Sequence, residues 1–193
     1  MPAAARKITA ADILPDAAFA AERKARRAAL LPAKRLRRVA LGPWATAYFE
    51  SYETMLFQVQ EMLLIEKGGA AQVADELAAY NPMIPQGAEL TATLMFEIDD
   101  PVRRARVLAE LGGVEDRFFL ERAAAVQEGD IERTREDGKT SSVHFLHFPL
   151  TPAQVAAFKA PAARVMVGCD HPRYAHLAVL SDASRAELAK DLA

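Results

Sequence analysis

The amino-acid sequence predicts a single α+β domain, residues 1–193, in which several helices pack against a mainly antiparallel sheet. Segments with helical periodicity alternate along the chain with segments rich in β-forming residues, without internal repeats or low-complexity tracts. Gly42-Pro43 and Asp137-Gly138 lie between consecutive strand-like segments, as in the hairpins that join antiparallel strands. A chain of 193 residues corresponds to one domain and is long enough to bury a full core.

Helices are expected where apolar residues recur at helical spacing between residues that start or stop a helix. Thr9–Asp12 and Thr151–Gln154 are capping boxes, and Asp100-Pro101 combines an N-cap residue with proline in the first turn. Pro32 is expected to end one helix, and Gly68-Gly69 the next. The expected helices are a short one beginning at Thr9 and others over about residues 16–31, 51–67, 70–80, 100–111, 151–159 and 181–193.

Strands are expected in shorter segments with alternating or β-branched apolar residues. Residues 89–98 alternate in part, with Leu90, Ala92, Leu94 and Phe96 set against Thr91, Thr93 and Glu97. A polar segment, Gln127–Lys139, separates two of the strands and contains the second hairpin turn. The expected strands cover about residues 36–41, 44–49, 89–98, 118–126, 141–150, 163–169 and 174–180.

Charge is unevenly distributed along the chain, although the net charge is only −2. Residues 1–49 hold ten Lys/Arg and three Asp/Glu, whereas residues 50–193 hold fourteen and twenty-three. We therefore expect a basic helical N-terminal layer, about residues 1–33, to lie against an acidic body, with docking of an acidic partner as the alternative. A nucleic-acid partner is not expected, because the basic cluster lacks interleaved aromatic residues and the pI is near 6.1.

The cysteine count and the absence of long apolar stretches predict the compartment. Cys169 is the only cysteine, which excludes an internal disulfide and a cysteine-based zinc site and fits a reducing environment. No stretch of sequence approaches the roughly 18 apolar residues of a membrane span. Asp12 and Asp16 follow the basic N-terminus at the place where a secretory signal would be apolar. We therefore predict a cytoplasmic protein without a membrane segment.

Polar and charged residues are concentrated between residues 37 and 66, within an otherwise apolar part of the chain. Burying such groups unpaired costs several kcal/mol, so their concentration predicts a polar network or a binding site. On the helix expected at 51–67, Thr54, Gln58 and Glu61 share one face, and Glu50 lies one turn above Thr54. This face either lines a pocket or is exposed to solvent.

Arg37 and Arg38 are neighbours on an expected strand, so one should face the core and the other the solvent. The inward arginine needs a carboxylate, and Glu50 or Glu97 could supply it in a structural ion pair. Binding of an external anion by this arginine is the alternative.

His171 follows a buried strand in a polar turn, a place where functional groups are common, and a turn-stabilising hydrogen bond is the alternative role. Tyr174 follows the same turn and is added to the candidate pocket. The candidate pocket residues are then Arg38, Glu50, Gln58, Glu61, Glu97, His171 and Tyr174.

A metal site is the alternative use of some of these residues, with Glu61 and Glu66 as oxygen ligands and His171 as a nitrogen ligand. No glutamate here forms the Glu-x-x-His pairs of di-iron bundles, which disfavours a di-iron site. Cys169 lies two residues before His171, so a Cys–His nucleophile pair is conceivable, but a small core residue is the simpler interpretation. Motifs of the common nucleotide-binding, serine-hydrolase and zinc-protease classes are absent.

Many of these residues match the pattern of one bacterial family. The matching residues are Arg37-Arg38-Val39, Leu41-Gly42-Pro43, Phe49-Glu50, Thr54, Gln58-x-Gln60-Glu61-Met62, Glu76, Tyr80-Asn81-Pro82-x-Ile84-Pro85, Glu89-Leu90-x-Ala92-Thr93-Leu94 and His171-Pro172-x-Tyr174. Over nearly its whole length the chain resembles the family of unknown function catalogued as domain-of-unknown-function family thirty-five-oh-one. The resemblance implies an association, through neighbouring genes, with rubrerythrin-type peroxide-scavenging proteins and iron–sulfur oxidoreductases.

From the residues and this resemblance, we expect a soluble cytoplasmic accessory protein of a redox or peroxide-stress module. It would bind a redox partner protein or a small anionic ligand in the polar pocket, with Glu61 and His171 as ligand or acid–base groups and Arg38 as the charge partner. One alternative is a metalloprotein or enzyme that uses Glu61, Glu66 and His171, with a metal ion as cofactor. The other is a scaffold whose basic N-terminal layer docks an acidic partner.

Overall fold

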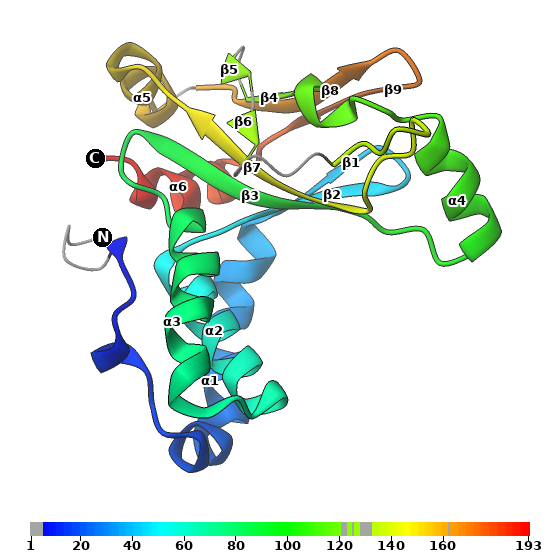
Figure 1. Ribbon diagram of the computed structural model, residues 1–193. Helices are drawn as coiled ribbons and strands as arrows, with labels where there is room; N and C mark the ends of the chain where they lie inside the picture. Colours follow the sequence, from blue (N-terminus) through cyan, green and yellow to red (C-terminus); the bar gives the residue numbers. More distant parts are fainter. Residues whose placement is uncertain (1–5, 121–122, 125, 128–132, 162) are drawn as a thin grey trace.

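Two antiparallel sheets and a layer of helices form the described part of the chain (Figure 1). The structure is a computed structural model that describes residues 6–120, 123–124, 126–127, 133–161 and 163–193. The α-helices are α1 (Asp16–Leu36), α2 (Tyr52–Glu66), α3 (Gly69–Tyr80), α4 (Pro101–Ala109), α5 (Pro152–Lys159) and α6 (Asp182–Leu188). The strands are β1 (Arg38–Leu41), β2 (Ala45–Phe49), β3 (Glu89–Phe96), β4 (Phe118–Leu120), β5 (Ala123–Ala124), β6 (Val126–Gln127), β7 (Val143–Pro149), β8 (Met166–His171) and β9 (Tyr174–Val179). The predicted α+β class is confirmed.

The first sheet has the strand order β1-β2-β3-β7-β6, and its neighbouring strands are antiparallel. The predicted hairpin joins β1 to β2, and Gly42 takes the positive φ of 69° at the turn, where glycine is favoured. β3 alternates as predicted, with its leucines and Ala92 buried on one face and Thr93 and Met95 on the other. The two faces of this sheet therefore differ in polarity.

The second sheet, β5-β4-β8-β9, packs over the apolar face of the first, and the main hydrophobic core lies between them. Leu108 of α4, Phe158 of α5 and Leu188 of α6 belong to the same core. Tyr174 connects the two sheets, because its buried hydroxyl donates to the Leu41 carbonyl and accepts from the Ala45 N–H at 2.8 Å. The predicted position of this tyrosine at the start of a strand is confirmed.

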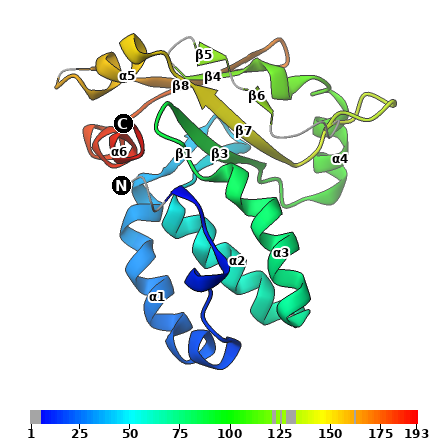
Figure 2. The ribbon, with the colours of Figure 1, turned by 60° about the vertical axis from the view of Figure 1, so that its left-hand side comes forward.

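Helices α1, α2 and α3 lie alongside one another beneath the first sheet (Figures 1 and 2). Met55, Val59 and Leu63 from the predicted apolar stripe of α2 form a second, smaller core in this layer. Gln60 is also buried, and its side-chain amide pairs with the backbone N–H and carbonyl of Leu14. Within the described ranges, no helix has both the length and the apolar character that crossing a membrane requires.

Several predicted element boundaries are wrong, and two of them change the architecture. Pro32 does not end its helix, because α1 continues to Leu36 with Pro32 inside it. Proline removes one helical hydrogen bond, and the surrounding surface of α1 is exposed, so water can solvate the freed carbonyl of Ala28. The strand expected at 118–126 is divided between the two sheets: β4 belongs to the second and β6 to the first.

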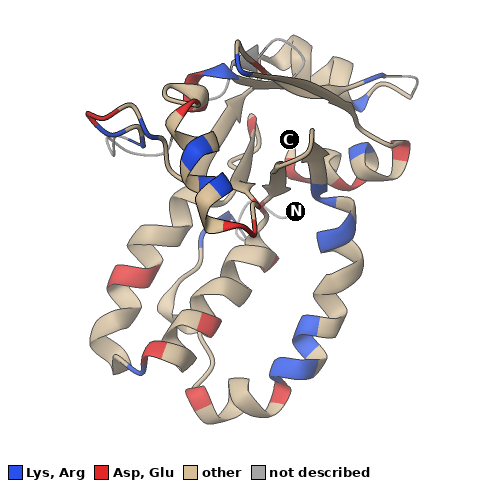
Figure 3. Ribbon diagram, turned by 90° about the vertical axis from the view of Figure 1, so that its right-hand side faces the viewer, with Lys and Arg blue, Asp and Glu red and all other residues tan. Residues whose placement is uncertain are grey.

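Basic side chains lie on α1 in two groups, at residues 23–27 and 34–35 (Figure 3). Arg23 binds both carboxylate oxygens of Glu61 on α2 at 2.6 Å, and Arg26 pairs with Glu22 one turn before it. The Arg23–Glu61 pair therefore joins the predicted basic layer to an acidic side chain of α2, whereas the Arg26–Glu22 pair lies within the layer. Docking of an acidic partner by the remaining basic residues of this layer stays a prediction.

Arg37 is buried at the end of α1, where four contacts hold its guanidinium. It donates to both carboxylate oxygens of Asp191, at 2.6 and 3.2 Å, and to Glu187 at 3.1 Å. Its fourth contact is to the backbone carbonyl of Glu50, at 3.0 Å. Although burial opposes the charge, the two carboxylates raise the pKa of Arg37. This network joins the C-terminal segment to the junction of α1 and β1.

The expectation that Arg37 and Arg38 face opposite sides is confirmed, but the predicted partner of the buried arginine is wrong. The carboxylates of Arg37 come from Glu187 and Asp191, roughly 150 residues away along the chain, rather than from Glu50 or Glu97. Arg38 is exposed and is the arginine that pairs with Glu97, at 3.2 Å. Sequence spacing indicates which residues can pair within one helix or hairpin, but it does not indicate an ion pair between residues this far apart in the chain.

Replacement of Arg37 by alanine should destabilise the protein strongly, because it leaves the buried Asp191 carboxylate without its partner. We expect the free energy of unfolding to fall by about 3–5 kcal/mol. Arg38→Ala is the matched control next to it, and breaking this exposed pair should cost about 0–1 kcal/mol. Urea unfolding of the three proteins measures both values, and equal losses for the two variants would contradict the role assigned to the buried network.

Candidate functional site

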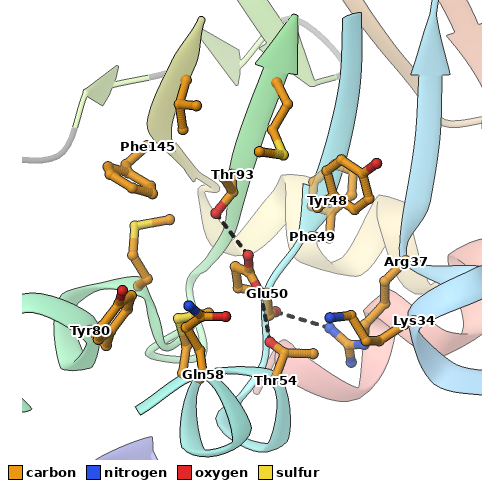
Figure 4. A pocket seen from close by; sticks show the side chains of 14 residues that line it. Lys34, Arg37, Tyr48, Phe49, Glu50, Thr54, Gln58, Tyr80, Thr93 and Phe145 are labelled. Carbon is orange, nitrogen blue, oxygen red and sulfur yellow. Dashed lines mark hydrogen bonds between the residues drawn. The ribbon is translucent and has the colours of Figure 1, made fainter. Parts of the chain in front are cut away.

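A cavity of about 460 Å³ lies between the polar face of the first sheet and the helical layer (Figure 4). We call it the central cavity. Tyr48, Thr93 and Phe145 form one cross-strand row of its wall, since they are register partners on β2, β3 and β7. Its lining residues are Lys34, Arg37, Tyr48, Phe49, Glu50, Thr54, Met55, Gln58, Tyr80, Met83, Thr93, Met95, Val143 and Phe145.

The turn from β2 into α2 places Glu50 in this cavity. Its backbone N–H bonds to the Thr91 carbonyl, which extends the pairing with β3 by one residue beyond β2. Ser51 then starts α2 as its N-cap: its hydroxyl accepts from the Thr54 N–H, and the Thr54 hydroxyl accepts from the Ser51 N–H. Glu50 is therefore fixed by a strand on one side and a helix start on the other.

Glu50 is only 9% exposed, and both oxygens of its carboxyl group accept hydrogen bonds. The Thr54 hydroxyl donates to Oε2 at 2.6 Å, and the Thr93 hydroxyl donates to Oε1 at 2.7 Å (Figure 4). Burial raises the pKa of Glu50, and this effect outweighs the two threonine hydrogen bonds and the nearby charges of Lys34 and Arg37, which lower it. The site thus holds a carboxyl group that is prone to keep its proton.

Three further polar side chains reach the central cavity from three different helices: Lys34 from α1, Gln58 from α2 and Tyr80 from α3. Among the described residues, the Lys34 ammonium, the Gln58 amide and the Tyr80 hydroxyl form no hydrogen bond or ion pair with any side chain or backbone group. Polar groups that converge on one cavity with their bonding capacity unused are the usual means of orienting a small ligand.

The rest of the wall is apolar and adaptable. Met55, Met83 and Met95 supply flexible thioethers, and Phe49 and Phe145 supply aromatic rings. Methionine side chains adjust to irregular shapes and contact aromatic rings favourably. The cavity can therefore accept a flat or apolar molecular body next to its polar end.

Two of the residues predicted for the pocket, Glu50 and Gln58, line the central cavity. Arg38 and Glu97 form an exposed pair outside it. There the Glu97 carboxylate also accepts from Thr46 and Tyr48, each at 2.6 Å, and these two bonds lead the interactions that lower the pKa of Glu97. Glu97 therefore links Arg38 of β1 with Thr46 and Tyr48 of β2.

Glu61 and Glu66 do not line the central cavity, and both bind neighbouring side chains. The bidentate hydrogen bonds from Arg23 lower the pKa of Glu61 and hold α1 against α2. Glu66 accepts from the Gln72 side-chain amide at 2.6 Å, across the turn between α2 and α3. Both carboxylates have structural partners in this arrangement.

His171 and Tyr174 belong to the second sheet. The Nδ1 atom of His171 accepts from the Arg173 N–H, and Nε2 lies 3.3 Å from the Gly112 carbonyl oxygen. These two contacts of the His171 ring correspond to the turn-stabilising role, which was the alternative to a role in the pocket. Tyr174 likewise uses its hydroxyl on backbone groups of the β1–β2 hairpin.

The three residues proposed as metal ligands are held by different partners: Glu61 by Arg23, Glu66 by Gln72, and His171 by the backbone of Gly112 and Arg173. In the part of the chain that the structure describes, no group of three or more His, Cys, Asp or Glu side chains is arranged to hold a metal ion. Cys169 is buried in the main core, and burial raises the pKa of its thiol to about 11, which makes it a poor nucleophile.

Several lining residues were not found from the sequence, among them Lys34, Tyr80 and Thr93. Thr93 carries a recognisable signal, a polar residue on one face of an alternating strand, but the pattern does not tell whether that face meets solvent or helices. Lys34 lies beyond Pro32, where the helix was expected to have ended.

The raised pKa of Glu50 predicts a pH-dependent contribution to stability. An ordinary glutamate has a pKa of 4.5, and the folded protein keeps the Glu50 proton above that value. The folded state then binds more protons than the unfolded state, so stability falls as pH rises from about 4.5 through the folded-state pKa. Glu50→Gln removes this titration, and wild type should lose stability relative to the variant over that range, as urea unfolding at several pH values can measure.

Glu97→Gln is the control for this experiment, because the lowered pKa of Glu97 has the opposite consequence. Its carboxylate stabilises the fold above the unfolded-state pKa, and that contribution is lost as pH falls. Wild type should therefore gain stability relative to Glu97→Gln as pH rises. Parallel pH profiles for wild type and Glu50→Gln would show that Glu50 ionises normally.

Comparison with known proteins places this architecture in one family. The chain is similar to a protein of unknown function from Burkholderia pseudomallei K96243, whose crystal structure matches it with a TM-score of 0.88 and 38% sequence identity, covering 97% of this chain and 100% of the other. A comparison with curated proteins found no match. Residues 7–192 match the family model described as "Protein of unknown function (DUF3501)". With this match over nearly its whole length, the chain belongs to the DUF3501 family.

Proposed function

We propose that this protein binds a small organic anion in the central cavity. The observation that carries the proposal is the convergence of Lys34, Gln58 and Tyr80, none of which has a partner among the described residues, on the buried Glu50 carboxyl. The apolar body of the ligand would lie against the methionines and Phe145, and its acidic group would meet the Lys34 ammonium. The volume of about 460 Å³ suits a small metabolite.

The raised pKa of Glu50 supports an anionic ligand. A protonated carboxyl can donate a hydrogen bond to the ligand and adds no negative charge beside it. A bound anion would in turn favour the protonated form of Glu50, because a nearby like charge disfavours ionisation. Binding and proton uptake are therefore coupled in this proposal, and affinity should fall as pH rises through the pKa of Glu50.

General acid–base chemistry by Glu50 is a second candidate, and the raised pKa of this group in a cavity favours it. In that case the same carboxyl would transfer a proton to or from the bound molecule. Glu50→Gln separates the two candidates: it should preserve binding of an anion and remove its pH dependence, whereas turnover of a substrate should be lost.

The predicted place in a redox or peroxide-stress module stays a prediction that rests on the family resemblance. The chemistry of Cys169 bears on the form it would take, because a buried thiol with a pKa of about 11 is poorly suited to thiol–disulfide exchange. We propose that the chain would act in such a module through its ligand or a redox partner protein rather than through this cysteine.

Methionine methyl NMR can detect ligands in the central cavity directly. Met55, Met83 and Met95 line it, while Met62 and Met166 do not and serve as internal controls. With ¹³C-methyl methionine, titration with benzoate, 4-hydroxyphenylacetate and octanoate should shift the three cavity methyls selectively for at least one of these acids. Lys34→Met should weaken that binding roughly tenfold, as expected for one charge-assisted hydrogen bond.

Lys24→Met is the matched control, because Lys24 is exposed on the same helix and does not line the central cavity. It should leave the affinity unchanged. Shifts of equal size at Met62 and Met166, or equal weakening by both lysine variants, would count against a specific site. Absence of any selective shift across the three acids would contradict the proposed ligand class.

A further inference from the structure

A second cavity, of about 490 Å³, lies between α4 and the hairpin formed by residues 133–142. We call it the hairpin cavity. Figure 3 shows Lys and Arg both on α4 and on this hairpin. The hairpin turns at Asp137-Gly138 as predicted, with an isolated bridge between Thr134 and Thr140. The hairpin cavity shares no lining residue with the central cavity.

The lining of the hairpin cavity has the composition of an oxyanion site. Four cationic side chains line it, together with three consecutive hydroxyl residues, Thr140, Ser141 and Ser142, of which Thr140 also donates to Glu115 at 3.2 Å. No carboxylate is among its lining residues. The cationic residues are Arg104, Arg133, Arg135 and Lys139.

None of these four cations forms an ion pair with an acidic side chain of the described residues. Arg23, Arg38 and Arg173 each pair with a glutamate at 3.2 Å or less. By contrast, within the described ranges no ion pair involves any of the four cations of the hairpin cavity. Like charges gathered without a directly paired carboxylate repel one another, and a bound anion with several charges would relieve that repulsion.

The hairpin is held in place independently of any ligand. The Thr134 hydroxyl accepts from the Gly113 N–H at 3.0 Å and donates to Glu115 at 2.7 Å. Gly112 packs so closely that an added Cβ would lie 2.5 Å from the Gly138 carbonyl oxygen. A fixed hairpin keeps its cations in position before binding, which lowers the entropy lost on association.

Two of the cations are themselves positioned by neighbouring groups. Arg104 donates to the Ile98 carbonyl at 3.1 Å. The guanidinium of Arg133 lies 5.0 Å from the centre of the Phe145 ring, in a cation–π contact. Arg135 and Lys139 make no such side-chain contact among the described residues, so their charged ends are free to meet a ligand.

We propose that the hairpin cavity binds a small molecule carrying two or more phosphoryl groups. Phosphate oxygens match a lining of guanidinium, ammonium and hydroxyl donors, and several linked phosphates supply enough charge for four cations. The source of the phosphates is either an inorganic polyphosphate or a nucleoside polyphosphate, and the experiment below distinguishes them. This site is independent of the ligand proposed for the central cavity.

Calorimetric titration with inorganic triphosphate and with ATP, at constant ionic strength and without added metal ion, tests the proposal. Saturable binding of one molecule per chain is expected for triphosphate. Arg135→Ala combined with Lys139→Ala should weaken it roughly tenfold or more, because two charge-assisted contacts are lost. Equal affinities for triphosphate and ATP would mean that the phosphates alone are recognised, and tighter ATP binding would identify a nucleotide site.

The charge-matched control is Arg103→Ala combined with Arg106→Ala, since both arginines are exposed on α4 and neither lines the hairpin cavity. It removes the same charge from the same region and should leave affinity within about twofold. Equal weakening by the two double variants would show diffuse attraction to a basic surface and overturn the proposal. Absence of saturable binding by either probe would overturn it as well.

Discussion

The arrangement of the central cavity depends on the hydrogen bonds of the buried Arg37 guanidinium. It joins α1, the end of β2 and the C-terminal segment, because its donors reach Asp191, Glu187 and the backbone carbonyl of Glu50. A buried charge of this kind is tolerated only when its donors are paired, so each of these segments is held in one position. Two residues of the cavity, Lys34 and Glu50, are placed by the segments that this arginine joins.

The polar end of the central cavity forms where β2, α2 and the last turn of α1 meet. β2 ends at Phe49, α2 begins after Ser51, and Glu50 lies between them with its carboxyl group held by hydroxyls from a helix and a strand. The last turn of α1 brings Lys34 to the same place, and this turn exists because the helix continues through Pro32. Because the exposed surface of α1 tolerates Pro32, the helix continues far enough for Lys34 to line the cavity.

The two cavities differ in the chemistry that they offer. The central cavity combines methionine and aromatic walls with a few polar groups, as expected of a site for an organic molecule. The hairpin cavity is lined by cations and hydroxyls, which favour phosphates. They are near neighbours, since Phe145 lines the first cavity and its ring supports Arg133 of the second. The cation–π contact between this ring and Arg133 is a direct physical contact between the two sites.

The sequence by itself determined the local features: the fold class, the hairpin at Gly42, the caps of α4 and α5, and the position of Glu50 one helical turn from Thr54. These follow from short-range sterics and hydrogen bonding, which depend on neighbouring residues. Only the tertiary structure decided that Arg37 meets Asp191, that Glu61 and His171 are occupied elsewhere, and that the central cavity gathers residues from separate elements. Contacts between segments distant in sequence arise from packing of whole layers, and no local pattern records which faces those layers bring together.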